Sequence, residues 1–300
     1  MWSWRRVLTA AGCVAATLSA CTNATAAAPG PAAGAATPVP APAAAAPTAG
    51  VPTAGVPTAG VPTAAASSAG ARSPGPAAAD GQGRTAPDGV VRHVGALFHA
   101  GSGHFCTGAL VAGGAADLVV TAAHCVSAGA GAPVYAGLDF APAYGHGTAP
   151  YGRWAAARVT VDPRWTAAAD PDLDVAFVEL APRDGRRLSD LLGADRIGFG
   201  PAAGATVRLT GYPDGADDAV TCLGTPTRPS AGQLRIACTG YPDGTSGSPW
   251  LTGWDPDTGT GTVVGVIGGY QQGGTDADVS YSPYFGADVR QLYARATAAR

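Results

Sequence analysis

Residues 119–125 read Val-Val-Thr-Ala-Ala-His-Cys, and residues 244–249 read Gly-Thr-Ser-Gly-Ser-Pro. The first stretch places the imidazole of His124 at the end of an apolar β-strand pattern. The second places the hydroxyl of Ser246 in a turn lined by glycines. A serine hydroxyl is a weak nucleophile at neutral pH unless a neighbouring base takes its proton, and histidine is the usual base. The two stretches therefore indicate a base and a nucleophile on separate segments.

A carboxylate lies between these two stretches. Residues 172–178 read Asp-Leu-Asp-Val-Ala-Phe-Val, and a buried aspartate can hold a histidine in one tautomer and stabilise its cation. Asp174 is followed directly by an apolar strand pattern, whereas Asp172 is followed by Leu and another Asp. We therefore predict Asp174 as the third member, with Asp172 as its competitor. The remaining histidines lack a comparable context and are expected at the surface: His93, His99, His104 and His146.

The motifs carry a family resemblance. Residues 104–108, His-Phe-Cys-Thr-Gly, together with residues 119–125 resemble the first half of the chymotrypsin-fold, trypsin-like serine peptidases. Residues 244–249 resemble the nucleophile turn of the bacterial, glutamyl-endopeptidase-like branch, and the order His, Asp, Ser is the chymotrypsin order. The resemblance covers residues 90–294. It implies an all-β fold of two packed six-stranded antiparallel β-barrels with a C-terminal helix.

The resemblance also implies an activity and its residues. It implies a serine endopeptidase that hydrolyses peptide bonds through an acyl-enzyme, with Ser246 as nucleophile, His124 as general base and Asp174 as its partner. The N–H groups of Gly244 and Ser246 are expected to form the oxyanion hole. A substrate pocket is expected at Gly240, Tyr241, Asp243, Ile267, Gly268 and Gly269.

Three positions depart from well-known members of the family. Gly240 stands where an acidic residue would select Arg or Lys, and Ile267 stands where a Glu-specific enzyme would offer a His. Trypsin-like and Glu-specific cleavage therefore both lose support, and the preferred side chain stays open. Thr245 stands where animal trypsins carry the Asp that pairs with a newly cut N-terminus. Activation by that ion pair is therefore not expected.

Four cysteines fall in the same region: Cys106, Cys125, Cys222 and Cys238. Four thiols allow three pairings. The resemblance implies a Cys106–Cys125 disulfide, which would brace the segment carrying His124, and this leaves Cys222 to pair with Cys238. A metal site is the alternative, but the spacings match no zinc template. The sequence indicates neither a metal nor a cofactor.

Composition excludes one class of function and supports the fold class. The 300 residues carry a net charge of -3, without the concentrated basic face that nucleic-acid binding needs. Short β-rich runs separated by Gly, Pro and Asp are typical of an all-β sandwich or barrel. Val289, Leu292 and Tyr293 recur at helical spacing and predict a helix near the C-terminus. The expected strands are 90–98, 107–111, 118–122, 134–138, 158–161, 175–180, 206–211, 233–238 and 262–267.

Residues 1–21 read as an export signal. Arg5 and Arg6 precede an apolar segment, residues 7–19, that is too short to span a bilayer. Residues 18–21, Leu-Ser-Ala-Cys, resemble a bacterial lipobox, which implies a lipid on Cys21 and a lipoprotein on the outer face of the cell membrane. Ordinary secretory cleavage nearby is the alternative and would give a secreted protein. Either route permits disulfides.

Residues 22–87 are predicted to be a disordered linker. They consist almost entirely of Ala, Pro, Gly and Thr, with Val-Pro-Thr-Ala-Gly at residue 51 repeated at residue 56. Such a segment has too few bulky side chains to build a core. The predicted division is therefore a signal at 1–21, a linker at 22–87 and a peptidase domain at 88–300.

We expect a monomer that acts on protein or peptide substrates, binds no nucleic acid and contacts the membrane through its lipidated N-terminus. Two other functions stay open at this level. The chain could be a catalytically silent trypsin-fold binding module, or a triad hydrolase acting on esters or cell-wall amides. The same three side chains serve those other acyl transfers, and fold alone does not separate them.

Overall fold

The computed structural model describes residues 84–85, 92–201 and 204–298. The predicted signal segment, the lipidation site at Cys21 and nearly all of the predicted linker lie outside the described residues. Within the described ranges, no helix is both long enough and apolar enough to cross a membrane.

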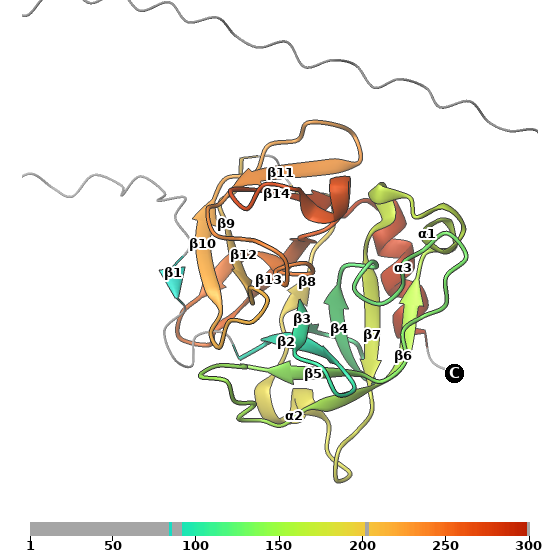
Figure 1. Ribbon diagram of the computed structural model, residues 1–300, viewed down its shortest axis with the longest axis vertical. Coiled ribbons are helices and arrows are strands. Elements are labelled where there is room, and N and C mark those ends of the chain that lie inside the picture. Colours follow the sequence, from blue (N-terminus) through green and yellow to red (C-terminus); the bar gives the residue numbers. More distant parts are fainter. Residues whose placement is uncertain (1–83, 86–91, 202–203, 299–300) are drawn as a thin grey trace, which may run out of the picture. The chain divides into compact units, whose positions relative to one another are not determined.

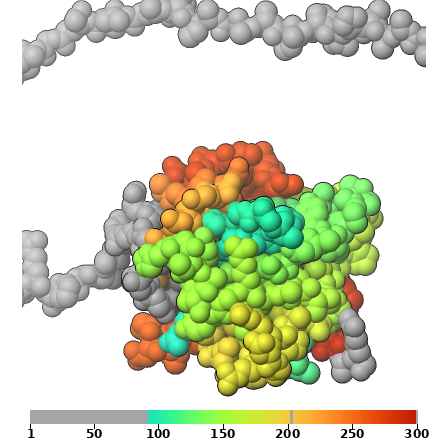
Figure 2. Space-filling view, turned by 60° about the horizontal axis from the view of Figure 1, so that its bottom comes forward, coloured from blue at the N-terminus to red at the C-terminus, as the bar shows by residue number. Residues whose placement is uncertain are grey.

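The first half of the domain is a closed β-barrel of six antiparallel strands (Figure 1). Around the barrel the strands follow the order β2, β3, β4, β7, β6, β5. Their bounds are Val94–His99 for β2, His104–Val111 for β3, Asp117–Thr121 for β4, Leu138–Pro142 for β5, Trp154–Val161 for β6 and Ala176–Leu180 for β7. All five residues of β4 are buried, as its run of Leu and Val favours. Figure 2 shows a face built mainly by this half, in green, with orange and red segments of the second half along its upper edge.

The second half contains a six-stranded sheet and a two-stranded ribbon. The sheet has the order β1, β10, β9, β12, β13, β8, and the ribbon pairs β11 with β14. The bounds are Arg84–Thr85 for β1, Arg196–Ile197 for β8, Val207–Gly211 for β9, Val220–Gly224 for β10, Gln233–Ala237 for β11, Pro249–Asp255 for β12, Thr260–Val266 for β13 and Val279–Pro283 for β14. All pairings are antiparallel except that of β8 with β13. The predicted all-β class is confirmed.

The first strand lies upstream of the predicted domain boundary. Residues 84 and 85, which composition placed in the linker, pair with β10 so that Arg84 stands opposite Thr221. The hydrogen-bonded sheet therefore begins before residue 88.

The predicted C-terminal helix is confirmed as α3 (Ala287–Thr297). It buries Val289, Leu292 and Ala296 and packs against β6 and β7, so the end of the chain returns to the first barrel (Figure 1). The other helices are short: α1 (Pro163–Ala168), α2 (Leu188–Leu192) and the 3-10 turns η1 (Pro171–Leu173) and η2 (Tyr270–Gly273). At the start of α1, the side chain of Asp162 accepts the N–H of Arg164, and Pro163 occupies the first turn, which satisfies groups that a helix start leaves unpaired.

One expected strand was wrong, and five strands of the described residues were not expected. The run 134–138 is strand only at its last residue, because β5 begins at Leu138 and continues to Pro142. The unexpected strands are the two-residue β1 and β8 and the longer β10, β12 and β14. β12 opens with Pro249 and contains Gly253, while β14 alternates serine with larger residues. These strands form because they pair with neighbouring strands, and not because their residues have a high β-propensity.

Both predicted disulfides are present. Cys106–Cys125 joins β3 to the turn after β4, and Cys222–Cys238 joins β10 to the segment after β11. The bridged residues are 19 and 16 positions apart in the sequence, respectively. Each disulfide therefore restricts the unfolded chain, and a loop of this length contributes about 3 kcal/mol of stability in the chain-entropy model.

Removal of the Cys222–Cys238 disulfide should lower the free energy of unfolding and leave the active site intact. We expect the double variant Cys222→Ala/Cys238→Ala to lose about 3 kcal/mol of unfolding free energy. Urea denaturation followed by tryptophan fluorescence measures this loss, and the folded variant should retain its activity. An unchanged urea midpoint would show that this disulfide contributes no stability.

Candidate active site

His124 lies in a tight turn directly after β4. The N–H of Val126 donates to the carbonyl of Ala123 at 3.0 Å, and the neighbouring Cys125 is tied to β3 by its disulfide. The side chain of His124 is 11% exposed. The turn therefore holds the imidazole at the end of the barrel while a small part of the side chain stays open to solvent.

Asp174 caps the end of η1, two residues before the start of β7 at Ala176, and its side chain is fully buried. Its Oδ2 accepts the Nδ1–H of His124 at 2.7 Å and the N–H of Gly269 at 2.8 Å. Its Oδ1 accepts the backbone N–H of His124 at 2.8 Å. Three N–H donors thus surround the carboxylate. A carboxylate only accepts, so Nδ1 carries the proton and Nε2 of the neutral ring is left as a base.

Asp172, the competing carboxylate, lies elsewhere. It is exposed and accepts the side-chain amide N–H of Gln233 at 2.6 Å. The structure therefore brings Asp174, and not Asp172, to the imidazole of His124.

Ser246 lies in the turn that precedes β12, in the second half of the domain. Its carbonyl accepts the N–H of Thr107, on β3, at 2.7 Å. The next residue, Gly247, has a φ of 82°, and a Cβ there would collide with the carbonyl of Thr107 and the hydroxyl of Thr121. Glycine at this position therefore lets the turn touch the first barrel, which brings Ser246 beside the segment that carries His124.

The N–H groups of this turn divide into two sets. Thr245, Gly247 and Ser248 donate to backbone carbonyls at 3.2, 2.7 and 3.0 Å. Within the described part of the chain, the N–H groups of Gly244 and Ser246 donate to none. Gly244 has a φ of 89°, a conformation that glycine adopts at no steric cost. Two unpaired N–H groups beside a serine hydroxyl are the arrangement that an oxyanion hole requires.

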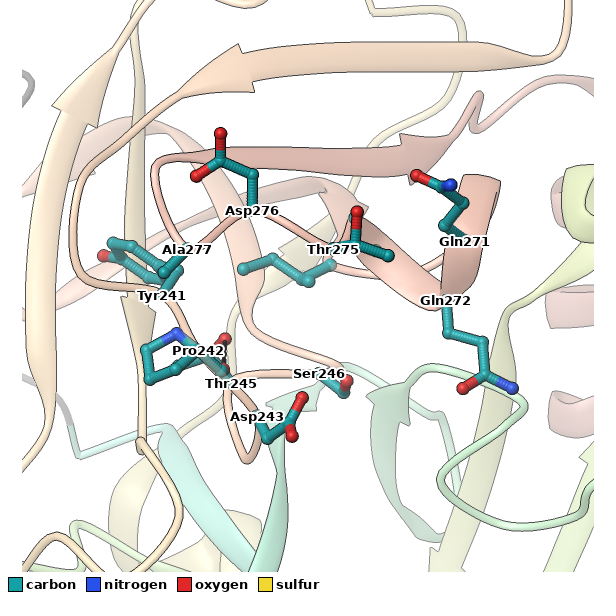
Figure 3. Close-up of a pocket in the computed structure, with 13 residues that line it drawn as sticks. Tyr241, Pro242, Asp243, Thr245, Ser246, Gln271, Gln272, Thr275, Asp276 and Ala277 are labelled. Carbon is teal, nitrogen blue, oxygen red and sulfur yellow. Dashed lines mark hydrogen bonds between the residues drawn. The ribbon is translucent and has the colours of Figure 1, made fainter. Parts of the chain in front are cut away.

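Two cavities meet at Ser246. The larger, of about 490 Å³, extends over the second half of the domain (Figure 3). The smaller, of about 330 Å³, contains His124 together with Phe105 and Tyr135. Asp243 and Gln272 border both cavities, as Ser246 does. Ser246 is therefore accessible from both cavities.

The predicted pocket residues lie in three different places. Tyr241, Asp243 and Ile267 line the larger cavity, whereas Gly240, Gly268 and Gly269 are not among its lining residues. Gly268 and Gly269 instead support the buried carboxylate. A Cβ on Gly268 would lie 3.1 Å from Oδ2 of Asp174, and Gly269 donates its N–H to the same oxygen. At Gly240, a Cβ would have no neighbouring atom within 4 Å.

The far wall of the larger cavity was missed from the sequence. It is formed by the segment from η2 to Ala277, including Gln271, Gln272, Thr275 and Asp276 (Figure 3). Gln271 and Gln272 both have left-handed backbone angles, with φ of 50° and 56°. No sequence pattern in this Gln/Gly-rich stretch predicts two consecutive residues with left-handed backbone angles.

The cavity has an apolar inner wall and an acidic rim. The hydroxyl of Tyr241 donates to the carbonyl of Leu209 at 3.0 Å, away from the cavity, and burial raises the pKa of Tyr241. Tyr241 therefore offers its ring, beside the buried Ile267. The charged residues that line the cavity are Asp243 and Asp276, both exposed carboxylates.

The expectation of surface positions was wrong for two histidines. His93 is 1% exposed and His104 is 5% exposed. Both ring nitrogens of His93 face backbone carbonyls, those of Gly259 and Leu192. His104 packs in an aromatic group with Phe98, Tyr144 and Tyr212. Nε2 of His104 also contacts the carbonyl of Ala216 at 2.8 Å, whereas its buried Nδ1 has no hydrogen-bond partner among the described residues.

One group of side chains within the described residues has a metal-like geometry. It consists of Cys106, Cys125 and His124. The two sulfurs are joined in a disulfide, so they are not the thiolates that bind metals. The disulfide in this group holds the turn that carries His124 against β3.

The sequence matches a known protein family. Residues 106–266 match the model of the trypsin-like peptidase domain family. The chain belongs to this family. Among curated proteins, none matches the sequence significantly.

Solved structures of serine proteases share the fold. The protease Anisep from Arthrobacter nicotinovorans is 29% identical, with a TM-score of 0.62 over 70% of this chain and 97% of that one. The thermostable serine protease AL20 from an extremophilic microorganism is 30% identical, with a TM-score of 0.62 over 70% and 99%. A Glu endopeptidase shares the fold at 20% identity, with a TM-score of 0.58 over 72% and 97%. The trypsin-like peptidase fold and these neighbours support a serine peptidase, a hydrolase of protein substrates.

Proposed function

We propose that this trypsin-like peptidase is a serine endopeptidase with Ser246 as nucleophile, His124 as general base and Asp174 as the carboxylate that orients the base. One observation carries the proposal. The imidazole of His124 donates to the fully buried Asp174 at 2.7 Å, and its ring borders the same cavity as Ser246. A buried, fully hydrogen-bonded Asp–His pair beside a serine has the geometry of nucleophilic acyl transfer.

The reaction follows from these positions. Nε2 of His124 takes the proton of the Ser246 hydroxyl as its oxygen attacks the substrate carbonyl carbon. The N–H groups of Gly244 and Ser246 stabilise the oxyanion that forms. The imidazolium then gives its proton to the departing amine, and water repeats the cycle on the acyl-enzyme. Within the described residues, no hydrogen bond joins the Ser246 hydroxyl to His124. Such contacts commonly tighten when substrate binds.

The position of His124 indicates which part of the substrate each cavity would receive. His124 must reach the leaving amine, and it borders the smaller cavity and not the larger one. The smaller cavity therefore receives the residue after the scissile bond. The larger one receives the side chain before that bond.

The charges of the larger cavity predict a preference. Asp243 and Asp276 are its two charged residues, so a substrate carboxylate before the scissile bond should be repelled. We expect kcat/KM to be lower for Glu than for Gln at this position. Asp243→Asn should narrow that difference by about two- to fivefold, which is the size of an exposed charge interaction.

Paired Glu and Gln peptides measure this preference directly. The effect should weaken at high salt, because exposed charges are screened. Asp257→Asn, an exposed carboxylate that lines neither cavity, is the control and should leave the ratio unchanged. A substrate preference for Glu, or an unaltered ratio in Asp243→Asn, would refute this assignment.

A panel of substrates tests the proposed reaction. Mass spectrometry of the products from an unfolded protein should show cleavage at internal peptide bonds that Ser246→Ala abolishes. Simple esters and cell-wall amides belong in the same panel. Turnover of those compounds without any peptide cleavage would replace the endopeptidase by a different acyl-transfer enzyme.

We propose further that the protein is exported and held at the outer face of the membrane by a lipid on Cys21. The support is the lipobox-like sequence at residues 18–21 and the linker that follows it. Cys21→Ala should move the protein from the membrane fraction to the medium. If the distribution does not change, the lipid anchor is refuted and ordinary secretion replaces it.

A further inference from the structure

Each proposed oxyanion donor shares a peptide group with a carbonyl. The N–H of Gly244 belongs to the peptide that carries the carbonyl of Asp243. The N–H of Ser246 belongs to the peptide that carries the carbonyl of Thr245. A trans peptide is planar, and its N–H and C=O point in opposite directions. Whatever holds these two carbonyls therefore also aims the two N–H groups.

Both carbonyls are held. The carbonyl of Asp243 accepts the backbone N–H of Asp214 at 2.8 Å. The carbonyl of Thr245 accepts two hydrogen bonds from Ser248, one from its backbone N–H at 3.0 Å and one from its hydroxyl at 2.6 Å. One peptide is thus held by backbone alone, whereas the other is held partly by a side chain.

Ser248 occupies a closed site behind the nucleophile turn. It is 0% exposed, and a Cβ on Gly211, the last residue of β9, would collide with its hydroxyl oxygen. Packing therefore restricts the hydroxyl to the direction of Thr245. A hydrogen bond at a carbonyl also polarises its peptide, which strengthens the N–H at the other end as a donor.

We propose that Ser248 is a positioning residue for the oxyanion hole: its buried hydroxyl holds the Thr245 carbonyl and thereby aims the N–H of Ser246 at the reacting carbonyl oxygen. The inference rests on the proposed function. It gives the second serine of the Gly-Thr-Ser-Gly-Ser-Pro turn a role separate from that of the nucleophile.

The test compares Ser248→Ala with a matched variant, Ser282→Ala. Ser282 is also 0% exposed and also binds backbone, accepting the N–H of Val266 and donating to the carbonyl of Pro283, but it lies on β14. Complete loss of an oxyanion donor lowers kcat by about 10²–10³-fold. For Ser248→Ala, where the donor stays but is less constrained, we expect about a tenfold loss in kcat with KM unchanged. Ser282→Ala should leave both values within about twofold.

A spectroscopic measurement separates positioning from general destabilisation. A peptidyl trifluoromethyl ketone forms a hemiketal with the active serine, and ¹⁹F NMR follows ionisation of its oxygen with pH. In Ser248→Ala this ionisation should move up by about one pH unit, the equivalent of the tenfold loss. Ser282→Ala should not move it, even where its melting temperature falls equally.

Two further outcomes are decisive. Ser248→Cys, which keeps a weak donor in the same place, should give an intermediate kcat, and it carries the test if Ser248→Ala does not fold. Unchanged kcat and hemiketal ionisation in the Ser248 variants, with an active wild type, would overturn the positioning role alone. A folded wild type without any hydrolysis or ketone adduct would overturn the proposed function and the positioning role together.

Discussion

Replacing Ser246 by Ala is expected to lower kcat by about six orders of magnitude, the loss seen when the nucleophile of a serine peptidase is removed. Of the residues that line both cavities, only Ser246 has a hydroxyl group. This hydroxyl lies beside the unpaired N–H groups of Gly244 and Ser246. The variant should bind peptide with an unchanged dissociation constant, because the missing oxygen acts in the reaction and not in binding.

A sensitive fluorogenic peptide measures the residual rate of the Ser246 variant, and active-site titration fixes the concentration of active wild type with which it is compared. Its thermal unfolding should match that of the wild type, since the hydroxyl makes no hydrogen bond within the described residues. A rate within tenfold of the wild type would mean that a different group attacks the substrate.

Asp174→Asn has the second-largest expected effect, a loss of about 10⁴-fold in kcat. Both oxygens of Asp174 accept N–H groups, and an asparagine has only one oxygen to offer. If that oxygen keeps the backbone N–H of His124, the amide NH₂ faces Nδ1. The imidazole must then turn Nδ1 into an acceptor and place its proton on Nε2. The ring can no longer take the proton of Ser246.

Asp172→Asn is the matched control, two residues away. Asp172 is exposed and binds Gln233, so its amide variant should keep kcat within about threefold, the scale of an exposed polar contact. A kinetic comparison from pH 6 to about pH 11 should also show part of the Asp174→Asn activity returning at the alkaline end, where hydroxide can serve in place of the imidazole. Equal losses in the two variants would contradict the assignment of Asp174.

Short motifs predicted the site because they report local chemistry. His124 and Ser246 are each embedded in five or six residues whose types are fixed by the turn around them, as the close contact at Gly247 illustrates. Asp174 was preferred over Asp172 because a buried strand follows it, and the structure places it next to His124. The cysteine pairing came from family resemblance, and both bridges formed as expected.

The rest of the site depends on contacts between distant segments. The larger cavity is closed by η2 and residues 275–277, whose position is set by tertiary packing and by left-handed Gln271 and Gln272. The support that Gly269 gives to Asp174 joins residues 95 positions apart. The burial of His104 depends on an aromatic group assembled from both halves of the domain. No local pattern carries this information.

The most direct test of the central claim is the intact mass of the purified protein after exposure to a fluorophosphonate, beside Ser246→Ala treated in the same way. The account predicts one adduct on the wild type, mapped to Ser246, and none on the variant, because only a serine with a working base and oxyanion hole reacts rapidly. Folded wild-type protein without an adduct, or an adduct that persists in Ser246→Ala, would contradict it.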